Sequence, residues 1–505
     1  MKKSAIIIFL FIIALTYLSG CKTVEDDYDK TDNYSTFFTD TFTYTGSDSI
    51  TDTFDNTSTD SETLTDTNTN TDSNTSSETL TDSSTDSDTS ITTETDTSTI
   101  SDTSTDSSTE SDTDTDFVII TDTEGNKIKN GSYTLSINGV SKSINAKYLI
   151  DGATVNINNG TYKSSSDSTN KVVFLVVNGG SLNIKGTADK PVMINKSGSV
   201  ALDGFVDNDY IDYGINSAIL VAGSYSSLTI DHADINTTSN GSSAIFSTNN
   251  SNVIIKNSTI STSGSNMSRG LNTSFGGYII ANYVSIETQG EFSPTLATGL
   301  NGGVIKASNM TLETDGADSP LLYSTGSINI DSSTGNAKSS QIAVIDVGST
   351  VVVDRCDFTC DGKGNKTGTS ESNLENHIVD SCGVFIYKNI ADKVNNGINY
   401  FTATNSNLSL TSSDIPMFYC TNVTANIVLN NNTFVLPSND DYFIMAEETS
   451  VWGTKGTNGG KINISLTNQN LNDYKAFRGA SSSSITQTPT DFSKPITDFT
   501  AETWW

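Results

Sequence analysis

Basic residues are scarce in this chain of 505 residues, which has 27 Lys and Arg against 59 Asp and Glu and a formal net charge of −32. None lies between Lys30 and Lys127, and the only arginines are Arg269, Arg355 and Arg478. A chain without a basic patch or stripe is poorly suited to bind nucleic acid or anionic lipid headgroups through charge. We therefore exclude nucleic acid as a partner.

Apolar residues and proline are also scarce, at 34% and seven residues respectively. Gly, Ser, Thr, Asn and Asp take their place, and long amphipathic helical patterns are missing. This composition disfavours several ordinary globular domains with thick cores, because too little apolar surface is available for burial. It favours one long, repetitive domain of short strands with many turns.

One apolar run stands at the start of the chain, where Lys2 and Lys3 precede "AIIIFLFIIALTYL". The run is shorter than the roughly 20 residues of a membrane span, so residues 1–20 are expected to be a secretory signal peptide. The "LSGC" that ends at Cys21 resembles the bacterial lipobox, in which the cysteine is acylated and becomes the new N-terminus. This resemblance implies a lipid anchor on Cys21; a plain signal peptide with a chance cysteine is the alternative.

The residues after Cys21, "KTVEDDYDK", put Lys22 next to the cysteine and then an acidic cluster. They resemble the sorting pattern of outer-membrane lipoproteins and the surface-export signal of some gut anaerobes. The resemblance implies an outer-membrane protein exposed on the cell surface. The alternative is that the cluster is only the start of an acidic linker.

A low-complexity segment rich in Ser, Thr and Asp follows. Residues 31–116 hold 21 acidic residues and no basic residue, so the remainder of the chain has a net charge of only −11. Such a segment cannot bury enough apolar surface to offset the entropy of ordering, and its like charges repel. Residues 21–116 are predicted to be a lipidated N-terminus and a disordered, extended tether for the domain at 117–505.

Two series of apolar residues repeat with a period near 25 in that domain. One series runs Ile219, Ile245, Leu271, Leu296, Leu322 and Val344 and continues less evenly to Phe385, Phe418 and Ile444. A second runs Ile235, Ile260, Ile286 and Leu312, and Gly264, Gly290 and Gly316 keep step with it. Two series locked to one period predict stacked repeats, each burying its apolar face against its neighbours.

The predicted fold is all-β, a right-handed parallel β-helix with coils of about 25 residues and about three short strands each, as in the pectin-lyase-like superfold. A left-handed form would need a hexapeptide repeat, which the sequence lacks. Residues 117–150 and the last fifteen residues are expected to cap the two ends, since exposed strand edges need cover. Polar insertions at 203–214 and 362–381 are expected to leave the stack as loops.

Several phrases between 215 and 470 resemble an adhesin-like class of bacterial surface lipoproteins with a parallel β-helix. They include "SRGLNTSFGGYIIANYVSIETQG", "SPLLYSTGSINI", "CGVFIY" and "WGTKGTNGG". The resemblance implies the fold and a surface location, and it names no ligand or reaction. The predicted anchor, the tether and a long repetitive face without converging catalytic groups lead us to expect adhesion, or binding to a glycan or surface protein of the host or the environment, as the function.

Enzymatic motifs of the β-helix polysaccharidases are absent. Asp440-Asp441 is the only adjacent Asp pair in the repeats and lacks the Gly-His-Gly that accompanies it in polygalacturonases. The tripeptide Ile230-Asp231-His232 is similar to one in pectate lyases, but aligning its coil with the next places His232 opposite Asn257. We therefore expect a non-enzymatic protein; a polysaccharide lyase or glycoside hydrolase, or a structural envelope component, is the alternative.

Four aromatic residues are candidates for stacking on sugar rings, although packing on the solenoid is the alternative for each: Tyr210, Tyr213, Tyr387 and Trp452. No cofactor is expected. A weak candidate for a calcium loop is formed by Asp203, Asp207, Asp209 and Asp212, whose oxygen ligands suit the ion although their order departs from the EF-hand; a solvated acidic loop is the alternative.

Four cysteines follow Cys21: Cys356, Cys360, Cys382 and Cys420. The Cys-x-x-x-Cys spacing, with His377 nearby, leaves a zinc site conceivable. Their positions in strands and turns of successive coils favour buried core thiols or one disulfide.

Overall fold

The computed structural model describes residues 118–165, 171–198, 208–346, 348–368, 377–378, 380–389, 397–438, 442–454, 457–469, 471, 475–478, 482–488 and 497–498. The predicted lipidation site Cys21, the predicted tether, Asp203 and Asp207 lie outside these residues. Among the described residues, no helix has the length and apolar character needed to cross a bilayer.

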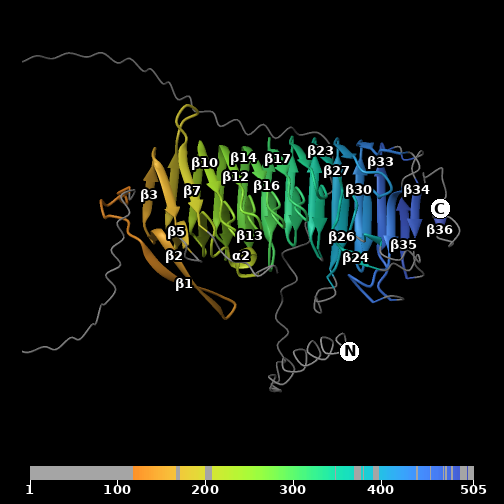
Figure 1. Cartoon of the computed structure of the whole chain (residues 1–505), viewed down its shortest axis with the longest axis horizontal. Coiled ribbons are helices and arrows are strands. Elements are labelled where there is room, and N and C mark those ends of the chain that lie inside the picture. Colours follow the sequence, from red (N-terminus) through yellow and green to blue (C-terminus); the bar gives the residue numbers. More distant parts are fainter. Residues whose placement is uncertain are drawn as a thin grey trace, which may run out of the picture. The chain divides into compact units, whose positions relative to one another are not determined.

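The fold is a parallel β-helix, as the sequence period predicts (Figure 1). Strands stack coil upon coil from β3 at one end to β35 near the other, and three columns of parallel strands run along the stack. We call these columns A, B and C in chain order within a coil. Column A belongs to a 14-stranded sheet, and columns B and C together form a 20-stranded sheet, counted over the residues listed above.

Column A contains β2 (Val140–Asp151), β5 (Lys171–Val177), β8 (Ile219–Ala222), β11 (Ile245–Thr248), β13 (Leu271–Ser274), β15 (Leu296–Thr298), β18 (Leu322–Ser324), β21 (Ala343–Ile345), β26 (Val384–Tyr387), β29 (Phe418–Thr421), β32 (Tyr442–Glu447), β34 (Lys475–Arg478) and β36 (Thr497–Asp498). The strand β1 (Gly131–Ile137) adds to the same sheet as the antiparallel partner of β2.

Column B contains β3 (Thr154–Ile157), β6 (Ser181–Lys185), β9 (Ser227–Asp231), the first halves of β12 (Asn252–Thr262) and β14 (Gly277–Thr288), β16 (Gly303–Ser308), β19 (Ser327–Asp331), β22 (Thr350–Asp354), β27 (Ile398–Thr404), β30 (Thr424–Asn430), β33 (Lys461–Thr467) and β35 (Ser484–Thr488). Column C contains β4 (Thr161–Ser165), β7 (Val192–Ser197), β10 (Ala233–Thr237), the second halves of β12 and β14, β17 (Thr311–Thr314), β20 (Thr334–Ala337), β23 (Asp357–Cys360), β28 (Asn407–Leu410) and β31 (Thr433–Val435).

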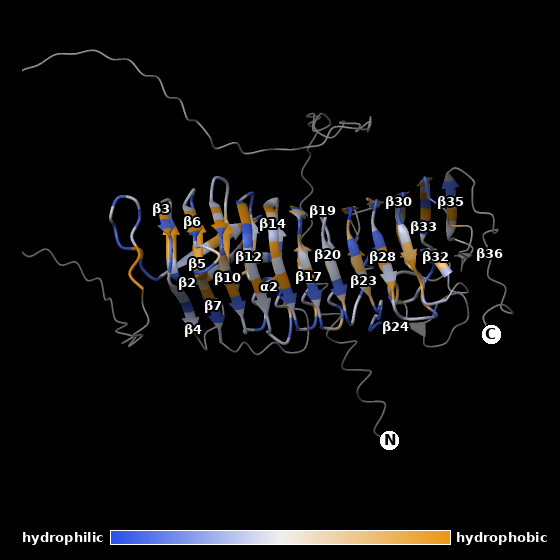
Figure 2. Ribbon diagram, turned by 90° about the horizontal axis from the view of Figure 1, so that it is seen from above, coloured by the Kyte–Doolittle hydropathy of each residue, from blue (hydrophilic) through white to orange (hydrophobic). Residues whose placement is uncertain are grey.

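The hydrophobic core fills the interior between the columns. Strands of columns B and C alternate buried and exposed residues, and the hydropathy colouring in Figure 2 follows this alternation along β12 and β14. The second apolar series lies in register as predicted, since Ile235 pairs with Ile260, Ile260 with Ile286 and Ile286 with Leu312. All four side chains are at most 2% exposed.

The first apolar series predicted the inward-pointing residue wrongly in two strands. Leu322 pairs with Ala343 and Ala343 with Val384, so Val344 and Phe385 lie one residue away from the inward row. Successive side chains of a strand point to opposite faces, and a shift of one residue therefore moves a side chain from one face to the other. Val344 and Phe385 thus lie on the outer face of column A.

The corner between columns B and C repeats one backbone conformation. A residue with φ between 48° and 61° lies at this corner in nine coils, and these residues are His232, Asn257, Tyr283, Asn309, Ser332, Arg355, Asn405, Asn431 and Asn468. Asn tolerates the left-handed region better than most residues, which explains its frequency here. Side-chain amides also bond from coil to coil, as from Asn431 Nδ2 to Asn405 Oδ1 at 2.8 Å.

Three stacked glycines lie at another turn. A Cβ on Gly316 would overlap the carbonyl oxygen of Gly290, and a Cβ on Gly290 would overlap that of Gly264. The coils approach too closely there for any side chain, which is the physical reason that these glycines keep the period of the sequence.

Two stretches of column A carry extra layers on the outer face. Hairpin β1–β2 and the helix α2 (Asn208–Tyr213) pack over the coils near Phe246 and Phe275, while a turn with Trp452 packs over Phe385 and Tyr419. Half of the insertion predicted as a loop at 203–214 is therefore a short helix. The insertion predicted at 362–381 contains a small antiparallel pair, β24 (Thr367–Gly368) with β25 (His377–Ile378).

Tyr283 is the bulky exception in the corner row, with φ of 54° and a side chain that is 60% exposed. Replacing Tyr283 by Asn should raise the free energy of unfolding by about 1 kcal/mol, because Asn accepts the left-handed conformation at less cost. Urea denaturation of both proteins measures the change. The control Tyr400→Asn removes an exposed tyrosine from the extended strand β27 and should lower stability. A lower stability of Tyr283→Asn would contradict the prediction.

Candidate functional site

A cleft of about 490 Å³ lies on the outer face of column A, between the two regions that the extra layers cover. We call it the column A cleft. The residues that line it are Ile211, Arg269, Phe292, Pro294, Asp318, Pro320, Tyr323, Gln341, Val344, Lys366, Asp380, Phe385, Tyr387, Asn389, Val451 and Trp452. Its volume falls within the roughly 300–1,000 Å³ of small-molecule pockets, and its lining is largely apolar with a few polar groups, as such pockets require.

The floor of the cleft is a row of outward side chains that the stacking brings together. Tyr323 pairs with Val344, and Val344 with Phe385, in three consecutive strands of column A. The two residues that the sequence period assigned to the core therefore contribute to this floor. Column A is buried on both faces over much of its length, because α2 and the hairpin cover it on one side of the cleft and the Trp452 turn covers it on the other.

Aromatic rings cluster at one end of the cleft. Phe385 and Tyr387 stack at 4.7 Å between ring centroids with an interplanar angle of 11°, and Trp452 meets Tyr387 edge-on at 4.7 Å. The indole Nε1 of Trp452 is buried without a hydrogen-bond partner. Burial strongly raises the pKa of the Tyr387 hydroxyl, which shares side-chain hydrogen bonds with Tyr323 and Asp346. The tyrosine is therefore a neutral, fixed part of the wall.

Two carboxyl groups lie along the rim near these rings. The backbone N–H of Lys366 donates to Asp380 Oδ1 at 3.1 Å, and Asn365 Nδ2 donates to Asp318 Oδ2 at 3.2 Å. The amide of Gln341 donates to the backbone oxygen of Asp380 at 2.6 Å. Both carboxyl groups thereby hold the segment around Lys366 against the stack.

The pKa of Asp380 is raised to about 7, chiefly by burial and secondly by the nearby charge of Asp318. Burial disfavours the ionised form of a carboxyl group, and a neighbouring carboxylate adds to the effect. Asp380 is consequently able to hold a proton near neutral pH.

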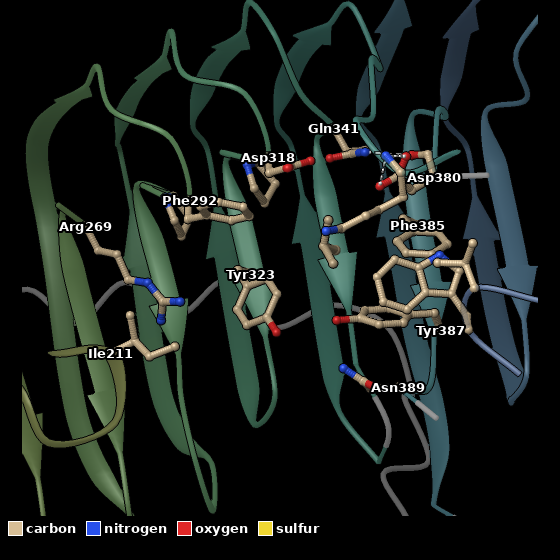
Figure 3. A pocket seen from close by; sticks show the side chains of 16 residues that line it. Ile211, Arg269, Phe292, Asp318, Tyr323, Gln341, Asp380, Phe385, Tyr387 and Asn389 are labelled. Carbon is tan, nitrogen blue, oxygen red and sulfur yellow. Dashed lines mark hydrogen bonds between the residues drawn. The ribbon is translucent and has the colours of Figure 1, made fainter. Parts of the chain in front are cut away.

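Arg269 lies at the opposite end, beside Ile211 of α2 (Figure 3). Its side chain points towards Tyr323, and its Cζ lies 5.4 Å from the centroid of that ring, a cation–π contact. The residue is only 5% exposed, and Nε and Nη1 have no hydrogen-bond partner.

The four aromatic candidates from the sequence divide into two pairs. Tyr387 and Trp452 line the column A cleft. Tyr210 and Tyr213 lie in α2, are 5% and 7% exposed, and pack in the apolar cluster beneath the hairpin β1–β2. Arg269, Tyr323 and Asp380, by contrast, are site residues that the sequence did not single out.

The candidate calcium loop is represented in the structure by two of its four acidic residues. Asp209 pairs with Lys142, whose Nζ lies 2.6 Å from Asp209 Oδ2, and Asp212 accepts a hydrogen bond from the backbone of Leu300 at 3.3 Å. Among the described residues, no group of three His, Cys, Asp or Glu side chains is placed to hold a metal ion.

The four cysteines of the repeats are free thiols, each at most 3% exposed. Burial raises the pKa of Cys356, Cys360 and Cys420 to about 12, and it raises the pKa of Cys382 well above its ordinary value. Thiols with such a pKa stay protonated and are poor nucleophiles and metal ligands. They serve as small apolar side chains of the core.

His232 occupies the corner slot that the sequence alignment of the two coils predicted. Asp231 pairs with Lys256, which puts His232 and Asn257 in equivalent positions, and His232 Nδ1 lies 2.7 Å from Asp231 Oδ1. A hollow of about 520 Å³ borders this corner, and its lining mixes polar residues with Ala188, Pro191, Tyr283 and Val284. His232 does not line the column A cleft.

Comparisons of the chain with protein-family models, with curated proteins and with solved structures returned no match. The chemistry of the column A cleft is therefore the basis for assigning a function.

Asp380 provides a test of the electrostatics of the cleft. Its raised pKa means that the folded protein keeps a proton that the unfolded chain has lost above about pH 4, so this group's contribution to stability falls as pH rises from about 4 to 7. The free energy of unfolding of Asp380→Asn, relative to the parent protein, should rise by up to about 4 kcal/mol across that window. Urea titrations at several pH values measure the difference; parallel curves would contradict the assigned pKa.

Proposed function

We propose that this protein is a cell-surface lipoprotein that binds glycans in the column A cleft and serves adhesion. The observation that carries the proposal is the grouping of Phe385, Tyr387 and Trp452 around a cleft that also holds polar groups. Aromatic faces stack on the C–H faces of sugar rings, while side-chain amides and carboxyl groups bind the hydroxyls. Asn389 and Gln341 supply amides of this kind in the same cleft.

The cell-surface location rests on the N-terminal sequence. A lipid on Cys21 would hold the protein at a membrane, and residues 31–116 would separate the β-helix from it by about 50 Å or more. The resemblance of the repeats to adhesin-like bacterial surface lipoproteins supports the same assignment. A purely structural envelope protein would have no use for a ligand-sized cleft with buried, unpartnered donors.

A polysaccharide-degrading enzyme is the second candidate, and one observation favours it. Asp318 and Asp380 lie in one cleft, and Asp380 has the raised pKa of a general acid. Against this, Asn365 and Lys366 donate hydrogen bonds to these carboxyl groups, which gives both of them a structural role. We therefore favour binding without turnover.

Replacing Trp452 by Ala should weaken glycan binding at least about tenfold, because the ring forms one wall of the aromatic end. Binding of the intact protein to a panel of neutral and acidic oligosaccharides, followed by calorimetry on those that bind, measures the loss. Tyr225→Ala is the matched control, since Tyr225 is an aromatic residue that is 88% exposed and does not line the cleft.

Equal binding by Trp452→Ala and the parent protein would overturn the location of the site. Release of new reducing or unsaturated ends from a polysaccharide, lost in Asp380→Asn, would replace the binding proposal by the enzymatic one.

The anchor is tested separately. Cys21→Ser should move the protein from the membrane fraction to the soluble fraction, because no acyl chain can then be attached. Protease added to intact cells should digest the parent protein if it faces the exterior. Membrane retention of Cys21→Ser would contradict lipidation, and protection from protease would contradict surface exposure.

A further inference from the structure

Arg269 carries a positive charge for which the part of the chain that the structure describes supplies no ion pair. Its guanidinium is buried, its Nε and Nη1 lack hydrogen-bond acceptors, and Asp212 is the only carboxylate whose charge acts on it appreciably. Asp212 acts on Arg269 through its charge alone, without a hydrogen bond between the two side chains. A buried guanidinium is costly unless it is paired, so this arrangement reduces the stability of the free protein.

Another arginine of the same fold shows the ordinary arrangement. Arg355 lies at the exposed corner between columns B and C, where its two terminal nitrogens each lie 2.5 Å from a carboxylate oxygen, one of Asp331 and one of Asp354. The stack is therefore able to supply carboxylates to an arginine. Arg269 differs from Arg355 because no carboxylate of the described residues lies at ion-pair distance from it.

The surroundings of Arg269 favour an anion. Ile211, Phe292, Pro294 and Tyr323 line the same end of the cleft, and these apolar groups exclude water. An ionic hydrogen bond is stronger in such an environment than in water. The planar fork of a guanidinium also matches the two oxygens of a carboxylate.

The opposite end of the cleft disfavours an anion. Asp380 lies there beside the aromatic group of Phe385, Tyr387 and Trp452, and Asp318 lies nearer the middle of the cleft, between Phe292 and Gln341 (Figure 3). A neutral sugar ring fits this end, since it stacks on aromatic faces and brings no negative charge near the two carboxyl groups. Arg269 is thus the cation at one end of the cleft, whereas the rest of the lining holds two carboxyl groups, Asp318 and Asp380, against one cation, Lys366.

We propose that Arg269 binds the carboxylate of an acidic sugar, such as a uronic acid, while a neutral neighbouring sugar occupies the aromatic end. The inference rests on the proposed glycan-binding function and names its ligand class and orientation. It also predicts discrimination against polyuronates, whose second carboxylate would face Asp318 and Asp380.

The test uses the full chain and a disaccharide of glucuronate and a neutral hexose, with calorimetry at low and high salt. The parent protein should bind the disaccharide at least about tenfold more tightly than its methyl ester, which has the same rings without the charge. High salt should reduce this advantage. A diuronate should bind more weakly than the mixed disaccharide.

A sulfated disaccharide tests whether the ligand anion is a sulfate or a carboxylate. Tighter binding of the sulfated sugar would overturn the carboxylate assignment.

Arg269→Gln should abolish the preference for acid over ester, and Arg269→Lys should restore only part of it because Lys lacks the planar fork. Arg355→Gln is the control and should leave the preference intact. The melting temperature of Arg269→Gln should equal or exceed that of the parent, because the change removes an unpaired buried charge. A fall in melting temperature together with an unchanged preference would assign Arg269 a structural role.

The two proposals fail differently. Neutral glycans could bind to the parent protein and lose affinity for Trp452→Ala, while the acidic disaccharide and its methyl ester bind equally well. In that case the inference about Arg269 is wrong and the glycan-binding function stands. If no glycan of either kind binds to the parent protein, both are wrong.

Discussion

Each coil of this protein is held to the next by a parallel ladder of backbone hydrogen bonds, with strands about 4.8 Å apart. Since the same contact recurs at every coil, each position of the repeat has the same surroundings in every coil, and these surroundings restrict which residues it accepts. The inward rows must be apolar, the corner between columns B and C must accept a left-handed conformation, and Gly290 and Gly316 must lack a side chain. The column A cleft exists because two added layers cover the outer face on either side and leave several coils between them open.

The periodic parts of this arrangement could be predicted from the sequence. The Ile235 series and the equivalence of His232 and Asn257 follow from a constant period, and the pairings confirm both. The first series failed at Val344 and Phe385 for a physical reason. The strands β21 and β26 are apolar on both faces, so hydrophobicity does not reveal which face Val344 or Phe385 takes. The coils there also depart from the regular length, which hides a shift of one residue.

The site could be predicted only in part. Trp452 and Tyr387 stood out in the sequence as aromatic residues near loops, and both line the cleft. Tyr210 and Tyr213 had the same signal, but the apolar side of a short helix buries them. Arg269 and Asp380 come from turns of different coils, and only the stack brings them to one surface. The residues next to Arg269 and Asp380 in the sequence give no sign that the two side chains line one cleft.

The position of the cleft within the stack bears on how the protein can keep an unpaired arginine. In a solenoid, stability is close to a sum of coil and interface contributions, so an unfavourable group in one coil is offset by its neighbours on both sides. A coil at either end has one neighbour only. Arg269 precedes β13, which pairs with β11 on one side and β15 on the other, so well-formed coils flank it in both directions. The regular repeats therefore supply the stability that lets one coil hold a charge poised for a ligand.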